Sequence, residues 1–92
     1  MRKIEITSQF KRDYKRESRT YPDLDDASLR PVLDMLARDA PLSARLRDHA
    51  LKGNWAGCRD CHLRPDLVLI YRKTENGTLT LVRLGSHSEL FS

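Results

Sequence analysis

A chain of 92 residues has room for one small domain with a single thin hydrophobic core. Hydrophobic residues make up 39% and charged residues 33%, a balance that is typical of a folded globular protein and excludes an intrinsically disordered one. No apolar run approaches the roughly 18 residues of a membrane span, so none is expected. The net charge of +4 suits a nucleic-acid surface, an acidic protein partner or simple solubility, and does not decide among them.

The N-terminal segment Met1–Asp13 carries basic residues but no apolar stretch of the kind that directs a protein to export. We therefore expect a cytoplasmic protein. The two cysteines are expected to stay free thiols in that reducing compartment.

The first expected elements are a strand and a helix. Lys3–Thr7 alternates polar and apolar side chains, which predicts a half-buried strand. Thr7 or Ser8 is expected to cap a helix that has Phe10 and Tyr14 on one face. A turn at residues 21–23 ends this helix.

A second helix is expected from five apolar residues at helical spacing, which are Leu24, Leu29, Val32, Leu33 and Leu36. Pro31 fits the first turn if Ser28 is the cap, and it kinks the helix if the start lies nearer to Asp23. Residues 42–54 have no clear period and are expected to form a loop.

From Trp55 onward the hydrophobic pattern changes to the period of two that is typical of strands. Three strands are expected, at Trp55–His62, Leu67–Tyr71 and Thr78–Leu84. The Asn76-Gly77 pair between the last two is a strong hairpin signal. The order β-α-α-β-β-β predicts one α+β domain over residues 1–92, with the N-terminal strand and two helices packed on a small antiparallel sheet. The second face of the sheet is then free to form a site.

The pattern Cys58-x-x-Cys61-His62 is compatible with haem attachment, half a zinc site or a redox pair. On a strand, however, residues three apart face opposite ways. Cys58 and Cys61 then can neither close a disulfide nor bind one metal together, and we expect them to be packing residues. The same alternation places Cys58, Asp60 and His62 on one face.

The three histidines, His49, His62 and His87, lie outside the apolar runs and are expected at one edge of the sheet with Asp66 and Arg83. Such a set suits RNA cleavage by attack of a ribose 2′-hydroxyl on the adjacent phosphate. Imidazoles supply the base and the acid, a guanidinium steadies the phosphate charge, and no metal is required.

Each of these residues also has an ordinary interpretation. Lone histidines are commonly surface or capping residues, and Arg83 is then a strand-edge charge. Asp66 caps the turn at Pro65, and Phe91 packs the C-terminus onto the core.

At many fixed spacings between positions 48 and 91 the chain resembles the YafQ-type branch of the RelE/ParE toxin superfamily. The matching segments are DHALKGNW at 48–55, GCRDCH at 57–62, Pro65-Asp66, Leu69-Ile70-Tyr71 and RLGSHSELF at 83–91.

The resemblance implies a RelE-like fold and a bacterial type II toxin. Such a toxin is an mRNA interferase, an endoribonuclease that enters the A site of the 70S ribosome and cuts translated mRNA without a cofactor. It implies inhibition by a small, partly disordered antitoxin of the DinJ/RelB type, in a higher-order toxin–antitoxin complex.

The resemblance also assigns the functional positions, which fall on His49, His62, Asp66, Arg83, His87 and Phe91. The histidines and Asp66 share the acid and base work, Arg83 steadies the phosphate and Phe91 positions the substrate. Which histidine is the base stays open. Leu67 replaces an aromatic residue that some relatives carry, so a base-stacking contact is lost and the codon preference is open.

Two alternatives remain. The ParE branch shares the fold but inhibits DNA gyrase without catalysis, and an inhibitor has no need of the histidine set. The second alternative is a small metal or haem protein that uses the segment CRDCH.

Overall fold

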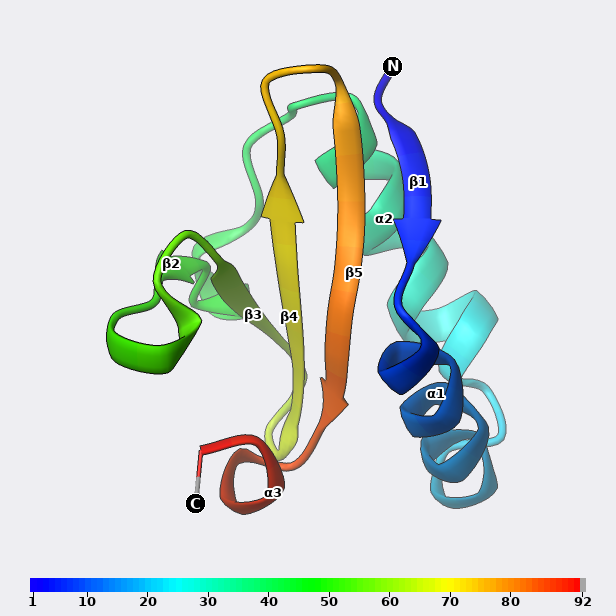
Figure 1. The fold of residues 1–92 in the computed structure, drawn as a ribbon. Coiled ribbons are helices and arrows are strands. Elements are labelled where there is room, and N and C mark those ends of the chain that lie inside the picture. The colour runs from blue at the N-terminus through cyan, green and yellow to red at the C-terminus, as the bar shows by residue number, and fades with distance from the viewer. Residues whose placement is uncertain (92) are drawn as a thin grey trace.

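The computed structural model describes residues 1–91, in which five strands form one sheet in the order β1-β5-β4-β3-β2 (Figure 1). The strands and α-helices are β1 Lys3–Ile6, α1 Ser8–Thr20, α2 Arg30–Ala37, β2 His49–Ala50, β3 Arg59–Arg64, β4 Leu67–Lys73, β5 Thr78–Gly85 and α3 His87–Phe91. A π-helical turn, Leu24–Leu29, precedes α2, and 3₁₀ turns occupy Ala44–Leu46 and Gly53–Trp55. None of these helices is long and apolar enough to cross a membrane.

The α+β class is confirmed, but the sheet is mixed. β1 pairs with β5 in parallel, whereas the other three strand pairs are antiparallel. A parallel pair requires a long connection between its strands, and here the chain from β1 to β5 passes through the helices and three other strands. The expectation of an all-antiparallel sheet was therefore wrong for the N-terminal strand.

The start of α1 confirms one prediction, and β1 contradicts another. Thr7 caps α1, since its Oγ1 accepts a hydrogen bond of 2.9 Å from Phe10 N. β1, by contrast, is not half-buried, because Ile4 and Ile6 are 43% and 52% exposed. β1 is an edge strand, and the core lies over the central strands instead.

The second helix follows the alternative that starts near Asp23. The chain is helical from Leu24, and Arg30 N donates to Asp25 O, five residues back, in a π-turn immediately before Pro31. Because Pro31 has no N–H to donate, this wider turn lets the chain enter α2 without a clash in the helix interior.

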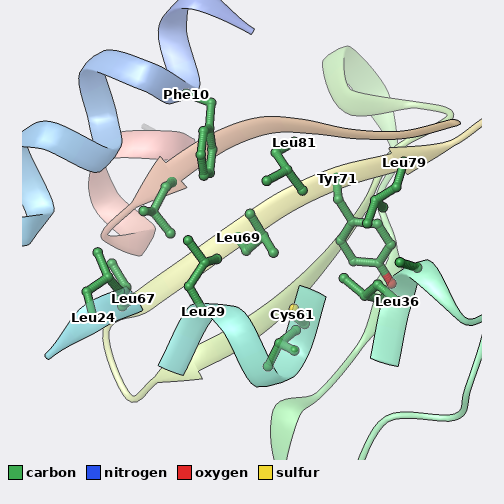
Figure 2. Close-up of a cluster of buried hydrophobic side chains, with 13 residues drawn as sticks. Phe10, Leu24, Leu29, Leu36, Cys61, Leu67, Leu69, Tyr71, Leu79 and Leu81 are labelled. Atoms are coloured by element: carbon green, nitrogen blue, oxygen red, sulfur yellow. The ribbon is translucent and has the colours of Figure 1, made fainter. Parts of the chain in front are cut away.

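The main core lies between the helices and one face of the sheet (Figure 2). It contains Phe10 of α1, five residues of the second helical segment and inward residues of β3, β4 and β5. The helical residues are Leu24, Leu29, Val32, Leu36 and Ala37, and the strand residues include Leu67, Leu69, Tyr71, Leu79, Leu81 and Leu84. Cys61 is fully buried in this core, whereas Cys58 belongs to a smaller cluster that also includes Val68, Ile70 and Leu90. The two cysteines are free and belong to different clusters, as the alternation predicted. Burial raises the pKa of Cys61 to about 12, which makes its thiol unreactive.

Two predictions for residues 42–62 were wrong. His49 lies not in a loop but in the two-residue strand β2, which pairs with β3. Trp55 lies in a 3₁₀ turn, and β3 begins only at Arg59. Gly53 and Gly57 have φ angles of +65° and +90°, which break the extended chain that alternation alone suggested.

The predicted hairpin between β4 and β5 is confirmed. Gly77 has a φ of +87°, and Thr74 N donates to Thr78 O across the turn. β5 leads into α3, which lies beside the end of β5 (Figure 1).

Candidate functional site

Four side chains form one row across the sheet. His49 of β2 is opposite Asp60 of β3, Asp60 is opposite Ile70 of β4, and Ile70 is opposite Arg83 of β5. Residues opposite each other point to the same face. Ile70 belongs to the smaller cluster and not to the core under the helices, so the row lies on the second face of the sheet. The structure thus places a histidine, a carboxylate and an arginine along one line.

A β-bulge puts Arg83 in this row. Leu79 and Leu81 point into the core, so strict alternation would direct Arg83 there too. The pairing shifts between Ile70 and Tyr71, which leaves Val82 without an opposite residue. One extra residue in β5 reverses the alternation and turns Arg83 to the second face.

His62 joins the site from the next row. It is opposite Val68, which in turn is opposite Gly85. A Cβ at Gly85 would lie 3.1 Å from Arg16 Nη2, so the glycine leaves room for this guanidinium of α1 beside β5.

Asp60 lies beside His49 and near enough to His62 and His87 for their charges to act on it. It is 2% exposed, and its Oδ1 lies 3.1 Å from His49 Nδ1. The hydrogen bond of that nitrogen, however, joins it to Arg47 O at 2.7 Å. Asp60 Oδ1 therefore has no hydrogen-bond partner within the described residues. Burial raises the pKa of Asp60, and the nearby charges of His49, His62 and His87 act in the opposite direction. An incompletely satisfied buried carboxylate next to a histidine is costly to the fold and is typical of a functional site.

Asp60 was not among the predicted site residues. The alternation of β3 had placed it on the face of His62, but no motif marked it. The available signal was its position: it is an acidic residue between Cys58 and Cys61, both of which are buried.

The C-terminal helix, which was not predicted, positions His87 and Phe91. Ser86 and Glu89 form a capping box, in which Ser86 Oγ accepts from Glu89 N and Glu89 Oε1 accepts from Ser86 N. The rings of His87 and Phe91 are 4.8 Å apart at their centroids. The S-x-x-E spacing was present in the sequence and could have revealed this helix.

The Asp66 side chain contacts the backbone of His87. Asp66 Oδ1 accepts a hydrogen bond of 3.3 Å from His87 N, so the turn between β3 and β4 holds the start of α3. In this geometry Asp66 orients His87, in addition to the role at the site that was predicted for it.

Arg83 is held by a partner that sequence reasoning missed. Its Nε and Nη2 donate to the two carboxylate oxygens of Asp13 on α1, at 2.7 and 3.1 Å. Asp13 is fully buried and also accepts from Leu84 N. Burial alone would raise the pKa of Asp13, but the hydrogen bonds and the charges of Arg83 and Arg16 lower it below its ordinary value. Nη1 of Arg83 has no hydrogen bond within residues 1–91 and is the nitrogen left for a ligand.

In the part of the chain that is described, no three His, Cys, Asp or Glu side chains are placed to hold a metal ion together.

The family of this chain follows from comparison with known proteins. The model of the family described as "Bacterial toxin of type II toxin-antitoxin system, YafQ" matches residues 2–92. The chain belongs to the YafQ family.

The known relatives match this chain over nearly their whole length. The mRNA interferase toxin YafQ of Escherichia coli K12 is 36% identical over 91 residues, which are 98% of this chain and 96% of that protein. A copper-bound mutant toxin from Helicobacter pylori is 40% identical, has a TM-score of 0.91, and the match covers 99% of this chain and 100% of that one. YafQ in the Escherichia coli DinJ–YafQ complex is 35% identical with a TM-score of 0.86, and both chains are covered completely. The resemblance of residues 48–91 to the YafQ-type branch and the RelE-like fold that it implied are both confirmed.

The departure at Leu67 has a structural consequence within this YafQ-family chain. Leu67 is fully buried in the core beneath the helices. Its side chain is therefore unavailable for stacking on a base of an RNA bound at the histidine face.

Proposed function

We propose that this YafQ-family protein is a ribosome-dependent mRNA endoribonuclease that cuts translated message by metal-independent acid–base catalysis. One observation carries the proposal: on the face of the sheet opposite the helical core, His49 lies 3.1 Å from the buried carboxylate of Asp60, and His62 and His87 are near enough for their charges to act on it. A gyrase inhibitor would need none of these histidines. The action takes place where ribosomes translate, in the cytoplasm.

His49 is the proposed general base. Its Nδ1 donates to Arg47 O, which leaves Nε2 with a lone pair to accept the proton of the ribose 2′-hydroxyl. The carboxylate of Asp60, 3.1 Å from Nδ1, stabilises the imidazolium that forms. Asp60 acts through His49 in this step and is a positioning residue.

The acid that protonates the leaving 5′-oxygen is His62 or His87. His62 lies on β3 in the row next to Asp60, and His87 begins α3, held by Asp66. The free Nη1 of Arg83 is the proposed donor to the phosphate oxygens, and Phe91, whose ring contacts that of His87, supports the nucleotide at the cut.

A cognate antitoxin is the proposed inhibitor, because the similar Escherichia coli toxin was solved in complex with DinJ. A chain with net charge +4 suits an acidic partner that folds as it binds. The ribosome and its mRNA are the proposed partners of the active form.

The experiment adds purified protein to ribosomes that translate a defined mRNA and maps the cut sites. We expect cuts within codons, and we expect His49→Ala, His62→Ala and His87→Ala to reduce the rate by roughly 10²-fold or more. Lys15→Ala, on the exposed face of α1, is the control and should cut like the wild type. Intact mRNA together with inhibited supercoiling by purified gyrase would instead support the ParE-like alternative.

A second measurement identifies the acid. An mRNA with a 5′-sulfur in place of the leaving oxygen needs no proton on its leaving group. This substrate should restore the rate of the variant that lacks the acid, and should leave the His49→Ala variant slow.

A further inference from the structure

A basic groove opens beside His62. Its volume is about 400 Å³, and it is lined by Arg45, Leu46, Arg47, His62, Leu63, Arg64 and Pro65. Every charged residue in this lining is an arginine, and no carboxylate takes part. The groove shares His62 with the candidate site, so a ligand that fills it contacts one of the site's imidazoles.

Two of the three arginines are free to bind a ligand. Arg64 donates from Nε to Ser28 Oγ and from Nη2 to Asp23 Oδ1, which fixes its guanidinium. Arg45 and Arg47 are exposed, and their side chains belong to no ion pair within residues 1–91. The groove therefore presents two unneutralised positive charges next to a fixed one.

Arg47 also links the groove to His49. Its φ of +51° places it in the left-handed region, which non-glycine residues adopt rarely. In this conformation its carbonyl accepts from His49 Nδ1 while its side chain lines the groove. One residue thus sets the ring of the proposed base with its main chain and offers a guanidinium to the neighbouring ligand.

We propose that this groove, and in particular the side chains of Arg45 and Arg47, binds the phosphates of the single-stranded mRNA that flanks the bond to be cut. This proposal rests on the ribonuclease function above. Guanidinium forks suit phosphate oxygens, and the half-buried Leu46 and Leu63 give a base or ribose an apolar surface. The two arginines contribute to substrate binding and take no part in the proton transfers.

An acidic protein segment is the other ligand that three arginines would attract. RNA is favoured because His62 is part of the groove's lining, so a phosphodiester chain bound there would present a linkage to an imidazole of the candidate site.

The test compares the double variant Arg45→Ala/Arg47→Ala with the matched variant Arg12→Ala/Arg19→Ala. The control loses the same charge from exposed positions on α1, where Arg12 bonds only to Gln9. Cleavage of mRNA on programmed ribosomes gives kcat and KM. We expect the groove variant to raise KM about tenfold and to change kcat less than twofold, and the control to match the wild type.

A second readout is independent of cleavage. Fluorescence anisotropy measures the binding of a single-stranded RNA oligonucleotide whose 2′-hydroxyls are methylated. We expect the groove variant to bind more weakly and its dependence of log K on log salt to be shallower by about 1.4, because two phosphate contacts are lost. This arm still tests the groove if the wild type does not cut mRNA, a result that would refute only the ribonuclease function.

Three results would overturn the proposal: an unchanged KM and RNA affinity, a loss confined to kcat, or a loss of antitoxin affinity with RNA binding intact. The last would assign the groove to the protein partner.

Discussion

Asp13 and Arg83 are 70 residues apart in the chain and form a two-pronged ion pair, with Nε–Oδ2 and Nη2–Oδ1 distances of 2.7 and 3.1 Å. The carboxylate is fully buried and the guanidinium side chain is 22% exposed. The pair connects α1 to β5 beyond the end of β1. A residue assigned to phosphate binding is thus also part of the framework.

The pair predicts that Arg83→Ala lowers both activity and stability. Removal of the guanidinium leaves Asp13 buried without its main partner, which should cost about 3 kcal/mol of unfolding free energy. Urea denaturation measures it. The double variant Asp13→Asn/Arg83→Ala should recover part of the lost stability. An Arg83→Ala variant as stable as the wild type would contradict the structural role of the ion pair.

Asp60→Asn should stabilise the protein while it reduces cleavage. Burial raises the pKa of Asp60, so the folded state holds the proton more tightly than the unfolded one. The stability due to this group is therefore present at low pH and is lost as pH rises from 3.8 through the raised value. Denaturation at a series of pH values should show that, above this range, the free energy of unfolding of the variant exceeds that of the wild type. Loss of stability at neutral pH would mean that the carboxylate is a structural group.

Asp39→Asn should remove part of the loss of stability that the protein undergoes at low pH. Lys73 and Arg2 lower the pKa of Asp39 to about 2, at N–O distances of 2.9 and 2.8 Å. The stability from this group is complete above pH 3.8 and is lost as pH falls through about 2. The variant should have a flatter profile in that window, and Asp26→Asn, at an exposed position of the π-turn, is the control. Asparagine tolerates the φ of +58° at this site, so the backbone is retained.

Ser86→Ala should loosen α3 and impair catalysis without unfolding the sheet. The capping box is worth about 1 kcal/mol at most, and α3 has only five residues. Hydrogen exchange should accelerate for the amides of residues 87–91 and remain slow in β4. If His87 depends on this helix, cleavage falls with the cap. Unchanged exchange at residues 87–91 would refute the role of the box.

Much of the fold was available from local patterns. Thr7 capped its helix, the Asn76-Gly77 pair made its hairpin, and Cys58 and Cys61 faced apart, because each of these depends on near neighbours in the chain. The wrong predictions arose where a single residue interrupts the alternation of side chains along a strand. The bulge at Val82 and the glycine turns before β3 broke alternations that a simple count would have continued.

The sequence by itself determined the class of fold, the family and the three histidines, since these depend on residue types and spacings. Only the tertiary structure decided that Asp60 lies beside His49, that Asp13 holds Arg83 and that Arg45 and Arg47 line one groove with His62. The physical reason is that such contacts join strands and helices far apart in the chain. Register, bulges and burial set them, and no local pattern records a partner 70 residues away.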